Sequence, residues 1–321
     1  MGYVTKYGSF WGLVPQTSGR IFWVAPAASY TVEGRSYVAS DGNDGLSPER
    51  ALLTVDYAIG LTTASVGDVI VMLPGSHSVS ATITVDIAGI TITGLPGSSP
   101  IQGARTTSGA ARNRSRITTT ETAGLVFTVT AADVEICWLD ITSIVAGAGI
   151  SAANTADRLY VHDCSFVFGA VDGTATFGIT LPLGTGTTTV NDDSTIRNCF
   201  FLCSANAGPA IRAAGTAIGL TIENSTFQLK GDTSWDDVIE ITLAGSLNTI
   251  IRDCDFFQES ITVVMTDCID VTGATGDGAT AVYRCYFPQG ADAFEATATV
   301  DIMCAENYLA SSTSGAVVGS A

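Results

Sequence analysis

The chain has 321 residues, a formal net charge of −17 and a sequence pI near 4.2. This excess of negative charge argues against nucleic acid as a partner, because nucleic acid is itself a polyanion. No apolar run is long enough to span a bilayer, which argues against an integral membrane protein. Only 14% of the residues are charged, and Gly and Thr are abundant, so the composition favours an all-β chain with many turns.

The N-terminal segment, residues 1–35, lacks the periodicity of the rest of the chain and is rich in aromatic residues. It could pack on its own domain, or it could dock onto a partner, since aromatic anchors are favoured in protein interfaces. We predict an attachment or oligomerisation arm, and no signal peptide, because an apolar core is missing from its first residues. The predicted partner-binding residues of the arm are Tyr3, Tyr7, Phe10, Trp11, Phe22 and Trp23.

Residues 36–67 are predicted to form a strand and a capping helix. Ser47 followed by Pro48 is typical of a helix start, and a helix is expected over residues 48–64. Such a helix would cover the open end of the following domain, whose first strands would otherwise expose unpaired edges. The apolar residues at helical spacing are Leu52, Val55, Ala58 and Ile59.

Five segments then repeat every 26 to 35 residues, and such a period is typical of a solenoid. Each segment contains an apolar residue, any residue, Asp or Asn, Cys or Ser, any residue, and Phe. Only Arg284 departs from the Asp or Asn rule. The segments are "VHDCSF" from Val161, "IRNCFF" from Ile196, "IENSTF" from Ile222, "IRDCDF" from Ile251 and "VYRCYF" from Val282.

Each column of the repeat has a physical interpretation. The apolar residue ends a short strand, and Asp or Asn turns the corner, because both residues tolerate left-handed backbone angles. The Cys or Ser begins the next strand and the Phe follows two residues later, so both face the bore of a parallel β-solenoid. The predicted structural ladders are Cys164, Cys199, Ser225, Cys254 and Cys285, and Phe166, Phe201, Phe227, Phe256 and Phe287.

Weaker copies of the repeat extend the solenoid over residues 68–310, starting at Ile90, Ile136 and Ile302. The coils differ in length, so loops are expected to project from the lateral face. The longest expected loop covers residues 170–193. Residues 311–321 are predicted to form a C-terminal tail.

The segment from Ser36 to Val79, with its Gly-Asn-Asp-Gly turn followed by "GDVIVMLPG", resembles the entry module of the pectate-lyase-like superfamily. The resemblance covers residues 36–310. It implies an all-β fold, a right-handed parallel β-helix, here with an N-terminal capping helix and an extended N-terminal arm. That superfamily includes polysaccharide lyases, glycosidases, epimerases, and bacteriophage tailspikes and other virion proteins, so the resemblance is specific for fold and poor for function.

Enzymes of that superfamily use acidic residues on the outer face of parallel strands, as paired carboxylates for glycosidic cleavage or as calcium ligands beside a basic residue. The motifs Asn-Thr-Asp, Gly-His-Gly, Arg-Ile-Lys and Arg-x-Pro-x-x-Arg are absent from this sequence. The pairs Asp192–Asp193 and Asp236–Asp237 are expected in turns, while Asp267 and Asp270 could line one face. We therefore predict no catalytic residue. If the protein is an enzyme, the candidate carboxylates are Asp236, Asp237 and Glu240.

Two histidines and eight cysteines are the remaining candidates for metal or acid–base chemistry. His77 has no ligand-type neighbour at metal-site spacing, and His162 occupies a repeat position that other coils fill with Arg, Glu or Tyr. Free thiols are expected, because the Cβ vectors of stacked cysteines run parallel, and the chain is expected to fold in a reducing host cytoplasm. We predict no metal and no cofactor.

One basic segment interrupts this acidic chain, in a region rich in Gly, Ser and Thr. It could be a solvated loop, or it could contact an acidic partner surface or an acidic glycan, because Arg binds carboxylates in a bidentate manner. The residues of this candidate contact are Arg105, Arg112, Arg114 and Arg116.

Three functions fit these observations. The missing motifs, the missing export signal and the aromatic arm favour a non-enzymatic structural protein on the surface of a bacteriophage virion, decorating or stabilising the capsid. The phage proteins it resembles imply a homotrimer, with the major capsid protein as the favoured partner. A phage tailspike or fibre that binds or depolymerises host surface polysaccharide is the first alternative. A polysaccharide lyase or glycoside hydrolase is the second.

Overall fold

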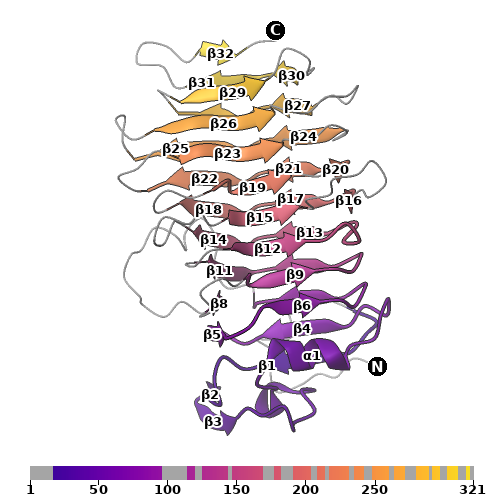
Figure 1. The fold of residues 1–321 in the computed structure, drawn as a ribbon. Helices are drawn as coiled ribbons and strands as arrows, with labels where there is room; N and C mark the ends of the chain where they lie inside the picture. Colours follow the sequence, from indigo (N-terminus) through magenta and orange to yellow (C-terminus); the bar gives the residue numbers. More distant parts are fainter. Residues whose placement is uncertain are drawn as a thin grey trace.

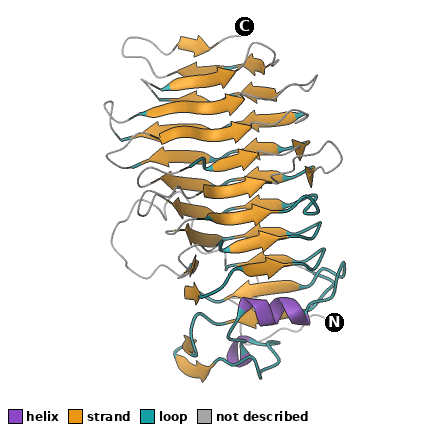
Figure 2. Ribbon diagram, in the orientation of Figure 1, coloured by secondary structure: helices purple, strands orange, loops and turns teal. Residues whose placement is uncertain are grey.

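The computed structural model describes residues 17–95, 114–119, 125–143, 147–168, 177–181, 191–203, 208–213, 217–230, 235–241, 248–259, 264–271, 280–288, 291–296, 302–309 and 316–318. These residues wind along one axis as a right-handed parallel β-helix with a short helix near one end (Figures 1 and 2). The predicted fold class is therefore confirmed. No helix in the described part of the chain has the length and apolar character needed to cross a bilayer.

Three parallel sheets form the walls of the solenoid, and a full coil contributes one strand to each sheet in the order I, II, III. The strands of sheet I are β1 (Ile21–Val24), β4 (Val69–Met72), β7 (Thr91–Thr93), β10 (Glu135–Cys137), β13 (Tyr160–His162), β17 (Thr195–Arg197), β21 (Thr221–Glu223), β24 (Thr249–Arg252), β27 (Thr280–Tyr283) and β30 (Ile302–Ala305).

From β10 onward, sheet II follows sheet I after a corner that contains one left-handed residue. Its strands are β5 (Gly75–Val79), β8 (Ser115–Thr119), β11 (Leu139–Ser143), β14 (Ser165–Phe168), β18 (Phe200–Cys203), β22 (Thr226–Leu229), β25 (Asp255–Gln258), β28 (Tyr286–Phe287), β31 (Asn307–Leu309) and β32 (Ala316–Val318). All neighbours in this sheet pair in parallel except β31 and β32, which pair antiparallel. Residues in the predicted C-terminal tail thus extend sheet II by one strand.

Sheet III completes each coil. Its strands are β6 (Ile83–Val85), β9 (Phe127–Val129), β12 (Ala148–Ala152), β15 (Phe177–Leu181), β19 (Ile211–Ala213), β23 (Trp235–Ile241), β26 (Met265–Val271) and β29 (Asp292–Ala296). Two small pairs lie outside the three sheets: the hairpin β2 (Ser29–Val32) with β3 (Arg35–Val38), and β16 (Asn191–Asp192) with β20 (Ala217–Ile218).

The corner between sheets I and II is the left-handed turn that the repeat predicts. The corner amides from Trp138 to Arg284 each donate a hydrogen bond to a carbonyl of the next coil, as Asp163 does to Arg197 at 3.1 Å. This backbone pairing does not depend on the side chain, so Arg284 turns the corner with a φ of 53°. The other corner residues with positive φ are Trp138, Asp163, Asn198, Asn224, Asp253 and Glu306.

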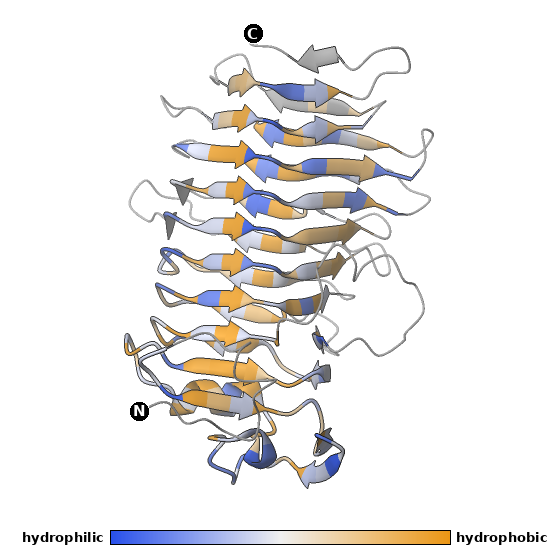
Figure 3. Ribbon diagram, turned by 180° about the vertical axis from the view of Figure 1, so that it is seen from behind, coloured by the Kyte–Doolittle hydropathy of each residue, from blue (hydrophilic) through white to orange (hydrophobic). Residues whose placement is uncertain are grey.

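The bore contains the two predicted ladders, and Figure 3 shows apolar segments recurring in successive coils. The phenyl rings from Phe166 to Phe287 stack with centroid separations of 4.8, 5.0, 4.9 and 5.1 Å. These distances match the spacing of adjacent strands, so one ring per coil fills the interior without a gap. The ladder residues Cys164, Cys199, Ser225, Cys254 and Cys285 are buried at the corner, immediately before the strands of sheet II.

The capping region differs from the single helix that the sequence predicts. Pro48–Arg50 form one 3-10 turn, η1, and the α-helix α1 begins later, at Val55, and ends at Leu61. The chain is extended between them, because Leu52 bridges to Val24 of the first coil. Thr54 is the N-cap of α1, and its hydroxyl accepts a hydrogen bond from the Tyr57 amide. The helix contacts β1, β4 and β6, so it does cover the end of the bore.

The solenoid also starts earlier than predicted. Strand β1 lies within residues 1–35, yet it pairs in parallel with β4 and forms the first strand of sheet I. Phe22 is only 2% exposed and Trp23 is fully buried, because both belong to this strand. Phe22 packs into the bore, whereas Trp23 points to the other face of β1 and packs with Tyr30 and Val32 in a second apolar cluster, so neither side chain presents a docking surface.

Candidate functional site

An acidic cluster lies on two neighbouring strands of sheet III, β23 and β26. Their register pairs Asp237 with Asp267 and Glu240 with Asp270, and neighbouring strands lie about 4.8 Å apart. Asp236 is exposed, Asp237 and Glu240 are half-buried, and Asp267 and Asp270 are 9% and 5% exposed. We call these five residues the acidic cluster.

Asp237 is a member of the acidic cluster whose ionisation is strongly changed by its neighbours. Partial burial, together with the negative charges of Asp270, Asp236, Glu240 and Asp267, raises the pKa of Asp237 to about 7. Both effects disfavour the charged form of a carboxyl group. At neutral pH this carboxyl therefore exchanges its proton readily, which is the property that general acid–base catalysis requires.

A basic residue lies directly beside the acidic cluster. Arg212 of β19 is the register partner of Glu240, and its Nε lies 3.0 Å from Glu240 Oε2. The guanidinium carbon also lies 5.5 Å from the centroid of the Phe177 ring, on β15 of the same sheet. Three consecutive strands of sheet III, β19, β23 and β26, thus place an arginine next to the acidic cluster.

The sequence named part of this cluster. The candidates Asp236, Asp237 and Glu240 all lie on β23, so the expectation that Asp236 and Asp237 occupy a turn is wrong. The same expectation is correct for Asp193, which has a left-handed φ of 56° between β16 and β17, and wrong for Asp192, which belongs to β16. Arg212 was not named, and it joins the cluster only through the register of β19 with β23.

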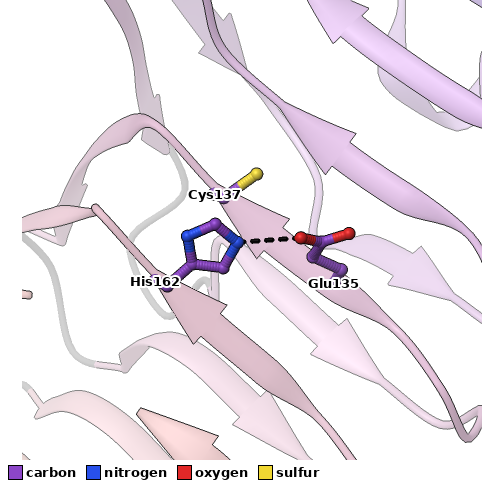
Figure 4. A group of neighbouring side chains, drawn as sticks. All are labelled: Glu135, Cys137 and His162. Atoms are coloured by element: carbon purple, nitrogen blue, oxygen red, sulfur yellow. Dashed lines mark hydrogen bonds and ion pairs between the residues drawn. The ribbon is translucent and has the colours of Figure 1, made fainter. Parts of the chain in front are cut away.

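A second cluster lies on sheet I and contains Glu135 and Cys137 of β10 and His162 of β13 (Figure 4). The imidazole is held between two carboxylates: Nε2 lies 2.8 Å from Glu135 Oε1 and Nδ1 lies 2.7 Å from Asp163 Oδ2. Its ring also stacks on Tyr160 with centroids 4.3 Å apart. We call Glu135, Cys137 and His162 the Glu–Cys–His cluster.

The ionisation of this cluster follows from its contacts. Burial alone would lower the pKa of His162, but interactions with Asp163, Cys137 and Glu135 outweigh burial and raise it to about 12. The hydrogen bond with His162 in turn lowers the pKa of Glu135. At neutral pH His162 is therefore an imidazolium held between Glu135 and Asp163, with the Cys137 side chain beside it.

The structure gives His162 close partners, although other coils fill its repeat position with Arg, Glu or Tyr. The repeat aligns Ile136 with Val161, and the strands keep this register, so Cys137 pairs with His162. Glu135 lies two residues before Cys137 and points to the same side of β10. The signal was therefore present in the aligned repeat, but it appears only when neighbouring coils are compared for contacts. His77, in contrast, is buried and bonds the Leu73 carbonyl through Nε2 at 2.8 Å.

The predicted basic contact is only partly described. Arg105 and Arg112 lie outside the described residues, as do Tyr3, Tyr7, Phe10 and Trp11 of the predicted arm. Arg114 is buried, and its guanidinium lies 3.0 Å from Asp140 Oδ1 and donates to the Asp163 carbonyl at 3.2 Å. Arg114 thus braces the corner next to His162, whereas Arg116 is exposed on β8.

All eight cysteines are free thiols, as the parallel stacking of their Cβ atoms predicts. The ladder thiols point to backbone carbonyls of the preceding coil, as Cys164 does to Ile136 at 3.6 Å and Cys199 to Val161 at 3.7 Å. Burial raises the pKa of Cys199 to about 12. These ladder cysteines are therefore structural, and Cys137 differs from them because it lies beside His162.

Comparison with known proteins identifies the fold. No family model matches the chain, and no curated protein matches it in sequence. Among solved structures it is similar to pectin methylesterase PemA from Erwinia chrysanthemi, with 12% identity, a TM-score of 0.55, and 94% of this chain and 92% of that chain covered. It is also similar to alginate lyase from Paenibacillus sp. str. FPU-7, with 17% identity, a TM-score of 0.55, and coverage of 79% and 92%. A rhamnogalacturonan lyase is similar at 12% identity and a TM-score of 0.51, with coverage of 90% and 87%.

These similarities confirm the parallel β-helix that the sequence resemblance implies. They contradict the prediction that the protein is not an enzyme, because the three proteins named above are an esterase and two lyases. None of them is a virion protein, so the phage part of the resemblance gains no support. The predicted homotrimer, its capsid partner and its location on a particle stay predictions.

Proposed function

We propose that the protein is a polysaccharide-processing enzyme and that the acidic cluster on sheet III is its active site. The observation that carries the proposal is the half-buried Asp237, whose pKa is raised to about 7 among four neighbouring carboxylates. The fold that it shares with an esterase and two lyases supports the same class of substrate. This replaces the non-enzymatic role with the second alternative that the sequence left open.

Within this proposal Asp237 is the general acid. It holds a proton at neutral pH and gives it to the leaving oxygen of the bond that is cleaved. A neighbouring carboxyl group, that of Asp267 on the adjacent strand, activates water or attacks the substrate directly. Arg212 orients Glu240 through their 3.0 Å contact. The reaction class that fits these roles is hydrolysis of a glycosidic or ester bond.

The charge of the site also bears on the substrate. The five carboxyl groups of the acidic cluster lie close together on a protein with a net charge of −17, so a polyanionic polymer would be repelled in the absence of cations. A neutral or esterified polysaccharide does not meet this repulsion. We therefore infer that the substrate is a neutral or esterified polysaccharide.

One observation favours a second candidate, β-elimination of an acidic polysaccharide. Clustered carboxylates beside Arg212 are the arrangement that the resemblance associates with calcium-dependent lyases, and carboxylate oxygens are the ligands that calcium prefers. In that reaction a base removes a proton from the substrate. Activity would then require calcium and would rise with pH.

The test is to incubate the full chain with methyl-esterified pectin, polygalacturonate, alginate and neutral glucans, with and without calcium. Hydrolysis yields new reducing ends or methanol, and elimination yields unsaturated ends that absorb ultraviolet light. We expect hydrolysis products that form without calcium, with a rate that falls as the pH rises through about 7, the pKa of Asp237. If none of these polymers yields a product, the proposal is contradicted.

The substitution Asp237→Asn gives the decisive comparison. It removes the proton donor while keeping the side-chain shape, and we expect the rate to fall by about 10²–10⁴-fold. The matched control is Asp255→Asn, an exposed aspartate on β25 of sheet II, which should keep full activity. Equal activity of both variants would assign the chemistry to another site.

A further inference from the structure

The Glu–Cys–His cluster brings three different ligand atoms to one place on sheet I. The carboxylate of Glu135, the sulfur of Cys137 and the imidazole of His162 offer ligand atoms that all lie within 4.8 Å of one another. They come from two neighbouring strands, β10 and β13, which are paired over three residues. Their relative positions are therefore set by a parallel ladder, as Figure 4 shows.

We propose that this cluster binds a divalent transition-metal ion of the zinc type. One sulfur, one nitrogen and one oxygen suit zinc, which accepts Cys, His and carboxylate ligands, whereas calcium and magnesium prefer oxygen alone. Three protein ligands leave a fourth tetrahedral position open. The proposal is independent of the polysaccharide chemistry on sheet III.

The surroundings of the cluster already have the form of a metal site. The Nδ1 atom of His162 lies 2.7 Å from Asp163 Oδ2, so Nε2 is the nitrogen directed at the cluster. Thr91 donates its hydroxyl hydrogen bond to Glu135 Oε2 at 2.8 Å, so Oε1 is the oxygen directed at the cluster. Outer carboxylate and hydroxyl partners of this kind orient metal ligands and fix the imidazole tautomer.

The ion would enter between His162 Nε2 and Glu135 Oε1, which lie 2.8 Å apart around a shared proton. Two metal–ligand bonds of about 2.0–2.1 Å at a tetrahedral angle span roughly 3.3 Å, so the two side chains must separate by roughly 0.5 Å. Glu135 can make this movement, because its side chain is 34% exposed, and that exposure also provides the path of entry.

Protons and charge balance in this step. Binding releases the shared proton from the imidazolium and the proton from the Cys137 thiol, because the ligands are a neutral imidazole and a thiolate. The ion brings two positive charges and two protons leave, so the net charge of the cluster is unchanged. As a thiolate, Cys137 completes the ligand set of one sulfur, one nitrogen and one oxygen.

Titration of the chelator-treated full chain with zinc and with cobalt tests the proposal. We expect one ion per chain by calorimetry and a sulfur-to-cobalt charge-transfer band in the cobalt spectrum, which only a thiolate ligand produces. Zinc should also raise the unfolding temperature, because it binds the folded state. Absence of binding, or cobalt binding without the charge-transfer band, would overturn the proposal.

Variants assign the ligands. Cys137→Ser should abolish the charge-transfer band and weaken zinc binding more than tenfold, and Asp163→Asn should weaken it by about 10–100-fold as an outer partner. The matched control is Cys304→Ser, a partly exposed cysteine on β30 of the same sheet, which should bind zinc as the unchanged chain does. Should Cys137→Ser fail to fold, Glu135→Gln, at a more exposed position, supplies the measurement. The assignment would be refuted if Cys304→Ser lost zinc binding while Cys137→Ser or Glu135→Gln kept it.

Discussion

The Glu–Cys–His cluster and the acidic cluster differ in how their partly buried charges are compensated. On sheet I, the imidazole of His162 lies between two carboxylates, and every charge has a partner of opposite sign within 2.8 Å. On sheet III, Asp237 is surrounded by carboxylates, and the one nearby cation described, Arg212, pairs with Glu240. The first arrangement satisfies its charges, while the second keeps one carboxyl protonated.

In both clusters a pKa is raised, but the effect on stability has opposite sign. The pKa of His162 rises to about 12 because its charged form is favoured in the folded protein. The pKa of Asp237 rises to about 7 because its charged form is disfavoured there. The Glu–Cys–His cluster therefore stabilises the fold at neutral pH, whereas ionisation of Asp237 destabilises the fold. A strained, proton-holding carboxyl is the kind of group that catalytic sites contain.

The largest effect is expected in the interior that both clusters share. Phe227 is fully buried and stacks between Phe201 and Phe256. Phe227→Ala should lower the free energy of unfolding by about 3–5 kcal/mol, because it removes a ring and leaves a cavity. The loss, measured by urea denaturation, should be the same at pH 5 and pH 8, since no charge is involved.

Phe257→Ala is the control for that measurement. Phe257 follows Phe256 on β25 but is 44% exposed. Its removal should change the free energy of unfolding by no more than about 0.5 kcal/mol. Comparable losses in both variants would contradict the assignment of the Phe ladder as the core.

A smaller effect is expected from His162→Gln, which removes the cation from the Glu–Cys–His cluster. Glu135 and Asp163 then keep their partial burial without a charged partner, and the free energy of unfolding at pH 7 should fall by roughly 1–3 kcal/mol. In the unchanged chain this contribution is complete below the unfolded pKa of about 6.5 and is lost as the pH rises toward about 12. Denaturation at pH 7 and pH 10 should show the variant and the unchanged chain converging, and a constant difference would contradict the ion-pair account.

The smallest effect is expected from Asp237→Asn, and it has the opposite sign. Between about pH 4 and pH 7 the folded protein holds a proton on Asp237 that the unfolded chain releases, so stability falls as the pH rises through this range. The variant removes that loss and should be more stable than the unchanged chain at pH 8, by up to about 1 kcal/mol after allowance for solvent screening. The thermal midpoints of the two proteins should coincide near pH 4. A less stable variant at pH 8 would show that the carboxylate is favourably paired.

The repeat predicted the solenoid well because its signal is local and periodic. Asn198 and Phe201 are three residues apart, and the same spacing places a left-handed corner and an inward ring in every coil. The capping helix was predicted less well. Helical spacing of Leu52 and Val55 is also compatible with an extended Leu52 that bridges to Val24, and only the tertiary contact decides between them.

The clusters were harder to predict, because their members meet across coils. Asp237 and Asp267 are thirty residues apart in sequence and are paired by the register of β23 and β26. The aligned segments of the repeat do not include these two strands. Cys137 and His162 were within reach, because the aligned repeat already placed them side by side. The position of His162 varies among the coils, but this variation does not argue against a ligand set, because a ligand set needs only one pair of coils.

The corner amides that bond from coil to coil fix the spacing of successive coils along the axis of the solenoid. The Glu–Cys–His cluster and the acidic cluster lie on different coils, and the coil of β17, β18 and β19 lies between His162 and Asp237 along the axis. Duplicating residues 196–221 would add one more coil there and move the two clusters apart by about 4.8 Å, while leaving the contacts within each unchanged. The axial distance between the two sites can thus change, by evolution or by design, only in steps of one coil.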